Sequence, residues 1–117
     1  MSHVLGAAEA RGAARKNFRR PAKILADDVV LMSAITTDIS DNGVGIMTEN
    51  PLPAGQVFVV AFDIPDGDRP KKINVGGKVA YCALRGMDGY HSGMQFMLVH
   101  PTTMETIRKF LGDGRPN

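Results

Sequence analysis

The chain has 117 residues, of which 44% are hydrophobic and 22% charged, and its formal net charge at pH 7 is +2. This length fits one domain around a single core. No apolar run approaches the ~20 residues that cross a bilayer, and no signal peptide is evident, so we expect a cytoplasmic protein. The lone Cys82 excludes an intrachain disulfide, and three scattered histidines give no metal-ligand spacing.

Positive charge is concentrated at the N-terminus. Residues 1–23 carry six basic side chains and one acidic side chain, whereas the remainder carries eight basic and eleven acidic ones. This asymmetry suits a compact anionic ligand better than a long polyanion lying across the fold. Within this region, residues 1–14 are rich in Ala and Gly, and we expect a flexible leader there.

Six stretches have the β-branched or alternating pattern that is typical of strands, with turn signals between them. We expect strands at residues 22–26, 29–38, 44–48, 56–64, 71–84 and 90–99. Ordered structure is expected to begin near Pro21, and Gly76-Gly77 predicts a bulge or bend.

Only the C-terminal region is predicted to be helical. Thr102 and Glu105 fit a capping box preceded by Pro101. An apolar face then follows, and Gly112 ends the run; the face consists of Met104, Ile107, Phe110 and Leu111. Because an open sheet of this size would expose its edges, the strands should close into a barrel. We therefore expect an all-β domain over residues 15–112, with six antiparallel strands, a C-terminal α-helix, a flexible basic N-terminal arm and a flexible tail at 113–117.

The basic arm contains the spacing R-x-x-x-R. Arg15 and Arg19 supply planar guanidinium groups that can grip a phosphate, contact the O6/N7 edge of guanine or stack on a purine. Lys16 and Arg20 add charge. The spacing alone is not specific, and a solvated basic tail is the alternative.

A second motif, D-x-S-x-x-G, follows the predicted strand 29–38. Alternation predicts that Asp38 and Ser40 share an outer face while Ile39 faces the core. The carboxylate can accept hydrogen bonds from the N1–H and N2–H edge of guanine, and Gly43 permits a close backbone approach to a ligand. The alternative is a turn that Asp38 and Ser40 merely cap.

The two motifs in this order resemble those of the PilZ family, whose members bind cyclic di-GMP. Arg19-Arg20-Pro21-Ala22 leading into a strand and Gly93-Met94-Gln95-Phe96 in the last strand are similar to further family features, over about residues 15–111. The resemblance implies a six-stranded antiparallel β-barrel with a C-terminal helix. Tyr81 stands where relatives often carry a Trp that stacks on guanine, although it could equally be a packed strand residue. Lys16 stands where many relatives have Arg, which is expected to lower affinity without abolishing binding.

On this basis the expected cyclic di-GMP-binding residues are Arg15, Lys16, Arg19, Arg20, Asp38, Ser40, Gly43, Tyr81 and Gly93. The resemblance implies a receptor or adaptor that reorganises its basic arm and signals in trans to an unidentified effector protein, with motility, chemotaxis, polysaccharide or virulence outputs all compatible. We expect a monomer or weak dimer, with no cofactor, no nucleic acid or membrane partner, and either one ligand or a stacked pair.

Two other functions remain open. One is a PilZ-like interaction module of pilus or motility assemblies that binds no nucleotide. The other is a small nucleic-acid-binding barrel, although the chain has few aromatic residues for base stacking. We do not expect an enzyme, because the sequence contains no paired carboxylates, activated nucleophile or metal set.

Overall fold

The computed structural model describes residues 15–112, so the expected leader and tail lie outside the described residues. The elements in chain order are β1 (Lys16–Asn17), β2 (Pro21–Ala26), β3 (Val29–Ile39), β4 (Gly43–Thr48), β5 (Val57–Asp66), β6 (Arg69–Leu84), the 3-10 turn η1 (Gly86–Asp88), β7 (Tyr90–Met97) and α2 (Pro101–Gly112). Within this range no helix is long and apolar enough to span a membrane.

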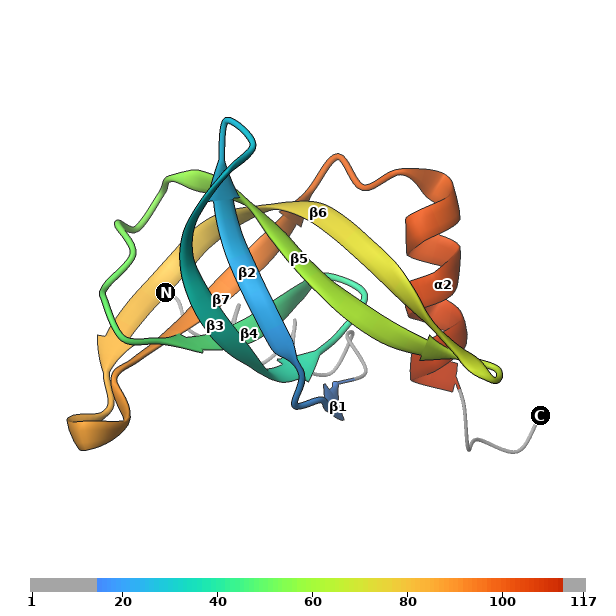
Figure 1. Cartoon of the computed structure of the whole chain (residues 1–117), viewed down its shortest axis with the longest axis horizontal. Helices are drawn as coiled ribbons and strands as arrows, with labels where there is room; N and C mark the ends of the chain where they lie inside the picture. The colour runs from blue at the N-terminus through green and yellow to red at the C-terminus, as the bar shows by residue number, and fades with distance from the viewer. Residues whose placement is uncertain (1–14, 113–117) are drawn as a thin grey trace, which may run out of the picture.

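Six strands form a closed ring of antiparallel pairs (Figure 1). The order around the ring is β2-β5-β6-β7-β4-β3, and pairing of β3 with β2 closes it. The short strand β1 pairs with the end of β3, outside the ring. Six antiparallel strands followed by one C-terminal helix confirm the predicted fold class.

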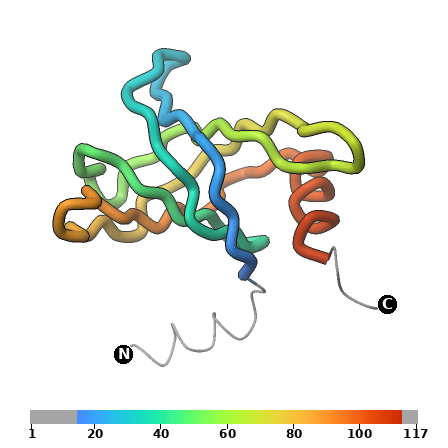
Figure 2. The backbone as a smooth tube through the Cα atoms, turned by 60° about the horizontal axis from the view of Figure 1, so that its bottom comes forward, coloured from blue at the N-terminus to red at the C-terminus, as the bar shows by residue number. Residues whose placement is uncertain are grey.

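Strand alternation fills the inside of the ring with apolar side chains. On β5, Phe58, Val60, Phe62 and Ile64 are buried, while Val57 and Val59 between them are exposed. Branched side chains from the other strands complete the core, among them Ile24, Ile39, Ile46, Ile73 and Val75. The helix α2 lies at one end of the long axis and the η1 hairpin at the other (Figure 2), and Ile107 of α2 is fully buried.

The bulge in β6 is not where the sequence predicted it. Pairing runs without a shift through Gly76 and Gly77 on both sides, and the register with β7 shifts between Val79 and Tyr81. Gly77 instead gives room for close packing, since a Cβ there would lie 3.2 Å from the Cβ of Met94. The predicted bulge at Gly76-Gly77 was therefore wrong, and the extra residue is Ala80.

The helix cap also differs from the prediction. The helix begins at Pro101, where proline is favoured because its missing N–H would have no helical partner. His100 accepts a hydrogen bond at Nδ1 from the Thr102 N–H, at 3.1 Å, and its carbonyl accepts one from the Met104 N–H. The residue before Pro101 is thus the cap, and Thr102 lies within the first turn.

Among the described residues, the basic arm is already ordered before Pro21, where order was expected to begin. Lys16 pairs with Ile39 and Asn17 with Asp38, so part of the arm expected to be flexible lies along β3. Thr36, which is fully buried, accepts from the Arg20 N–H at 2.8 Å and donates to the Phe18 carbonyl at 2.6 Å.

Phe18 anchors the arm in the core. Its side chain is 4% exposed, and its ring meets Phe62 of β5 and Phe110 of α2 edge-on, with centroid distances of 5.6 and 5.3 Å. Edge-on aromatic pairs add to the gain from burying the ring area. The arm therefore joins the ring to the helix.

Replacing Phe18 by Ala should destabilise the protein by about 3–5 kcal/mol, because it leaves a cavity bordered by two aromatic rings. Denaturation with guanidinium chloride measures this. Met87→Ala, at a fully exposed position, is the control and should change stability by less than about 0.5 kcal/mol. Equal stability of the two variants would contradict the anchoring role.

Candidate functional site

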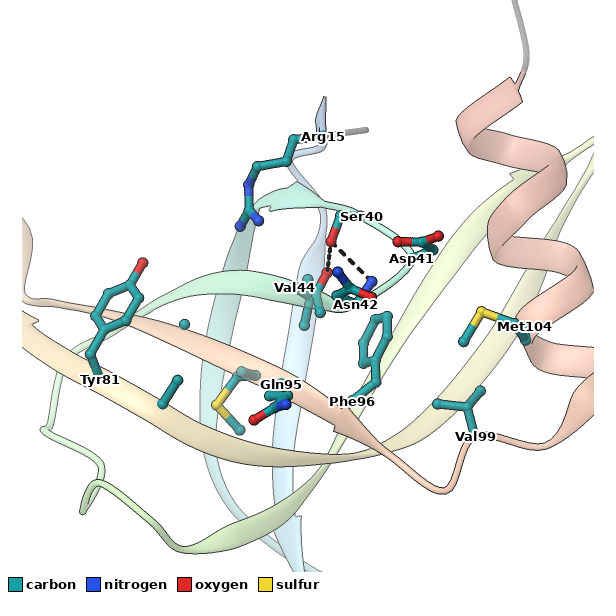
Figure 3. Close-up of a pocket in the computed structure, with 14 residues that line it drawn as sticks. Arg15, Ser40, Asp41, Asn42, Val44, Tyr81, Gln95, Phe96, Val99 and Met104 are labelled. Carbon is teal, nitrogen blue, oxygen red and sulfur yellow. Dashed lines mark hydrogen bonds between the residues drawn. The ribbon is translucent and has the colours of Figure 1, made fainter. Parts of the chain in front are cut away.

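An open pocket of about 590 Å³ lies beside the end of the arm. Its lining comes from Arg15, from the β3–β4 turn at residues 40–43, from β6 and β7, from Val99 just before α2, and from Met104 of α2 (Figure 3). The pocket thus lies where the two sequence motifs meet the last strands of the ring.

Arg15 and Asp38 form an ion pair beside this pocket. The Arg15 Nε lies 3.2 Å from Asp38 Oδ2 and its Nη2 lies 3.4 Å from Oδ1. Two guanidinium nitrogens thus each donate to a different carboxylate oxygen. The side chains are 48% and 29% exposed. An exposed pair of this kind contributes little to stability, about 0–1 kcal/mol. Its groups can therefore exchange partners at low cost.

Ser40 does not share an outer face with Asp38. The strand β3 ends at Ile39, and Ser40 is fully buried in the turn that follows. Its hydroxyl accepts from the Asn42 N–H at 3.1 Å and donates to the Gly43 carbonyl at 3.4 Å. The predicted orientation was wrong because the strand ends before Ser40, and the hydroxyl caps the turn.

Gly43 is needed for packing between strands. A Cβ at this position would overlap the carbonyl oxygen of Met94 on β7. Its φ is not among the positive values of the described chain. Any side chain here would push β4 away from β7 and open the ring beside the pocket.

The ring of Tyr81 lies directly over Gly93. A Cβ on Gly93 would stand only 2.8 Å from Tyr81 Cζ, so the missing side chain makes room for the ring. Tyr81 is 46% exposed, and in Figure 3 its hydroxyl points toward the Arg15 guanidinium. Burial, followed by the Asp38 charge, raises the pKa of Tyr81, so the hydroxyl is protonated at neutral pH. The pocket thus contains a half-exposed aromatic ring beside a cation.

His91 is a site residue that sequence reasoning missed. Its Nδ1 lies 3.3 Å from the Tyr81 hydroxyl and its Nε2 lies 3.3 Å from Thr37 Oγ1, which is 3.4 Å from Asp38 Oδ1. His91 therefore connects the aromatic ring to the carboxylate. Gly45 makes room for this group, because a Cβ there would overlap Asp38 Oδ1 and approach the His91 Nε2 to 3.2 Å.

The other basic residues of the arm point to different places. Lys16 donates from Nζ to the Phe110 carbonyl at 3.1 Å and lies 4.1 Å from the centre of the Phe110 ring, so it contacts α2. Arg19 lines a different pocket together with His91. Arg20 lines a third one, near the β5–β6 hairpin. Of the nine residues expected from the sequence, the pocket brings together Arg15, Ser40, Gly43, Tyr81 and Gly93, with Asp38 paired to Arg15.

The described residues contain no group of three or more His, Cys, Asp or Glu side chains that could hold a metal ion. The donors at the site are guanidinium, hydroxyl and imidazole groups. Of its two carboxylates, Asp38 is paired with Arg15, and Asp41 lines the pocket. This set matches an anion that also carries hydrogen-bond donors, rather than a metal.

His91 should titrate below its ordinary pKa of 6.5, because burial and then the Arg85 charge disfavour the imidazolium. Since the unfolded chain then binds the proton more readily, this group's stabilising contribution is present above pH 6.5 and is lost as pH falls through the folded pKa. In NMR titrations of the ring, Arg85→Ala should raise the pKa and Asp38→Asn should lower it further. A His91 pKa above 6.5 in the unsubstituted protein would contradict this environment.

Comparison with known proteins identifies the family and the fold. The family model described as PilZ domain matches residues 9–113, and no curated protein sequence matches the chain. Among solved structures, the fold is similar to the Bacillus subtilis inhibitor of motility MotI/DgrA, with a TM-score of 0.74 and 10% identity, over 85% of this chain and 48% of that one. The chain therefore spans about half the length of that protein.

Two further structures have the same fold. The PilZ domain of YcgR from Escherichia coli, solved with c-di-GMP, gives a TM-score of 0.65 at 13% identity, over 87% of this chain and 88% of that one. A tetrameric PilZ domain from Xanthomonas campestris gives 0.54 at 16% identity, over 73% of this chain and 46% of that one. At such identities the likeness shows the fold alone. Because the family model covers most of the sequence, the chain belongs to the PilZ domain family.

Proposed function

We propose that this chain is a cyclic di-GMP receptor that acts on a protein partner in trans. The observation that carries the proposal is the Arg15–Asp38 ion pair beside a pocket with the half-exposed ring of Tyr81. Membership of the PilZ family and the similarity to the YcgR PilZ domain solved with c-di-GMP support it.

The ion pair offers complementary groups to one guanine nucleotide. A guanidinium can bind a phosphate through two N–H groups or contact the O6/N7 edge of guanine. A carboxylate can accept from the N1–H and N2–H groups of the same base. Because the pair is solvent-exposed, exchanging it for ligand contacts costs little, whereas each new charge-assisted hydrogen bond contributes about 1.5–3 kcal/mol.

The Tyr81 ring offers a stacking surface. It is the one exposed aromatic side chain among residues 15–112, where the five Phe rings are buried or partly buried. A single exposed ring suits one base of a small ligand. A nucleic-acid-binding barrel would instead need a series of exposed rings along the strand path, so the nucleotide receptor is the function that the site supports best.

The arm provides a route from the ligand to the surface of the protein. Arg15 lies just before Lys16, which contacts the last turn of α2 through the carbonyl and ring of Phe110. A ligand that moves Arg15 would also displace the neighbouring Lys16 from Phe110. We infer that rearrangement of the arm and of the adjoining end of α2 is what the partner protein detects.

Substitution of Arg15 or Arg19 by Ala should weaken cyclic di-GMP binding about tenfold to a hundredfold, since each removes a charge-assisted hydrogen bond. Isothermal titration calorimetry measures the affinity and stoichiometry, with GTP and cyclic di-AMP as comparison ligands. Arg108→Ala is the matched control, because it removes an equal charge from the exposed side of α2.

Absence of cyclic di-GMP binding by the unsubstituted protein would refute the receptor and leave the interaction module without nucleotide as the better interpretation. Tighter, strongly salt-dependent binding of single-stranded RNA would favour the nucleic-acid-binding barrel instead. If both arginine variants bind cyclic di-GMP with unchanged affinity, the arm is not part of the binding site.

A further inference from the structure

A second pocket, of about 800 Å³, adjoins the first. It is lined by Arg19, by Thr37 and His91, and by residues of the η1 hairpin that include Arg85. Thr37 and His91 are hydrogen-bonded to each other, and His91 is bonded on its other side to Tyr81 of the first pocket. The two pockets are therefore linked by the hydrogen bond between Tyr81, which lines the first, and His91, which lines the second.

Two arginines from distant parts of the chain face this second pocket. Arg19 comes from the arm, and Arg85 follows the end of β6. Both are exposed, and within residues 15–112 neither guanidinium makes a hydrogen bond or an ion pair. Arg85 lines the same pocket as His91, and its positive charge acts to lower the pKa values of both Tyr81 and His91. Two unpaired guanidinium groups beside one cavity form an anion-binding pair.

The same pocket has an apolar floor. Ile35 on β3 pairs with Met47 on β4, and both side chains line the cavity. Ile35 is 45% exposed, although the neighbouring strand positions Ala34 and Thr36 are buried. A partly apolar surface next to cationic groups suits a planar base that carries a phosphate.

One carboxylate, Asp88 of η1, also lines this cavity. It opposes binding of a simple anion. It can, however, accept hydrogen bonds from the N1–H and N2–H edge of guanine, the same role that Asp38 offers beside the first pocket. The lining is therefore suited to a guanine nucleotide rather than to inorganic phosphate.

We propose that the second pocket is a guanine-nucleotide subsite, in which Arg85 and Arg19 bind the phosphate. The base packs against Ile35 and Met47, and the Asp88 carboxylate accepts hydrogen bonds from its N1–H and N2–H groups. The subsite takes the second guanosine phosphate unit of the ligand whose first unit occupies the Tyr81 pocket. This inference rests on the proposed receptor function, and it adds to the two sequence motifs four residues that neither motif contains: Ile35, Met47, Arg85 and Asp88.

The experiment is an NMR titration of the full chain with 5′-GMP and, separately, with cyclic di-GMP, following the Nε–H signals of the arginines. We expect the Arg19 and Arg85 signals to shift with both ligands. Arg85→Ala should weaken binding of each about tenfold, through the lost charge-assisted contacts. Asp88→Asn should reduce the preference for 5′-GMP over 5′-AMP while leaving the affinity for 5′-AMP equal or higher, because it removes a negative charge.

Arg69→Ala is the matched control, since it removes the same charge from another exposed hairpin, between β5 and β6, and should change neither affinity. If Arg85→Ala binds both ligands like the unsubstituted protein while Arg15→Ala does not, the subsite is wrong and the receptor function stands. If 5′-GMP shifts the Arg85 signal but cyclic di-GMP does not bind, the receptor function is wrong and the subsite stands as a mononucleotide site. Equal weakening by Arg69→Ala would show only a general effect of charge and would overturn the subsite.

Discussion

The site depends on the pairing of β3 with three other strands. Its first part pairs with β2, and its last residues pair with β4 on one side and with β1 on the other. Asp38 lies opposite Asn17 of the arm and opposite Gly45 of β4. Backbone pairing on both sides fixes the Asp38 backbone, so its side chain is presented beside Arg15 and Thr37.

The contacts that hold the arm against the ring of strands are strong at Phe18 and weak at Arg15. Phe18 is buried between two aromatic rings, and the buried Thr36 hydroxyl ties the backbone on either side of it to β3. Arg15, three residues earlier, is held at its side chain by an exposed ion pair alone. Burial of a Phe ring outweighs such a pair several-fold. Phe18 is therefore a fixed part of the fold, whereas the Arg15 side chain can exchange partners.

Glycines shape the site as much as charged side chains do. Gly43 allows β4 to approach β7, Gly45 makes room for Asp38 and Thr37, and Gly93 makes room for the Tyr81 ring. The three lie on two paired strands, with Gly45 opposite Gly93. A surface without Cβ atoms at these positions lets polar and aromatic side chains from neighbouring strands lie flat against the ring, where they form the lining of the pockets.

The sequence by itself determined the six strands of the ring, the C-terminal helix and the two motifs, because alternation, turn residues and helical periodicity are local properties. It did not predict β1. It could not determine which side chains of the motifs face the pocket. The Ser40 side chain is buried because β3 ends one residue earlier. Lys16 contacts α2 because the packing of Phe18 against Phe110 holds this part of the arm beside the helix. His91 and Arg85 carried no recognisable motif. They became part of the site because β7 pairs with β4, a strand distant in the sequence, which brings the β6–β7 hairpin next to Arg19. Pairing of that kind is decided by the tertiary structure alone.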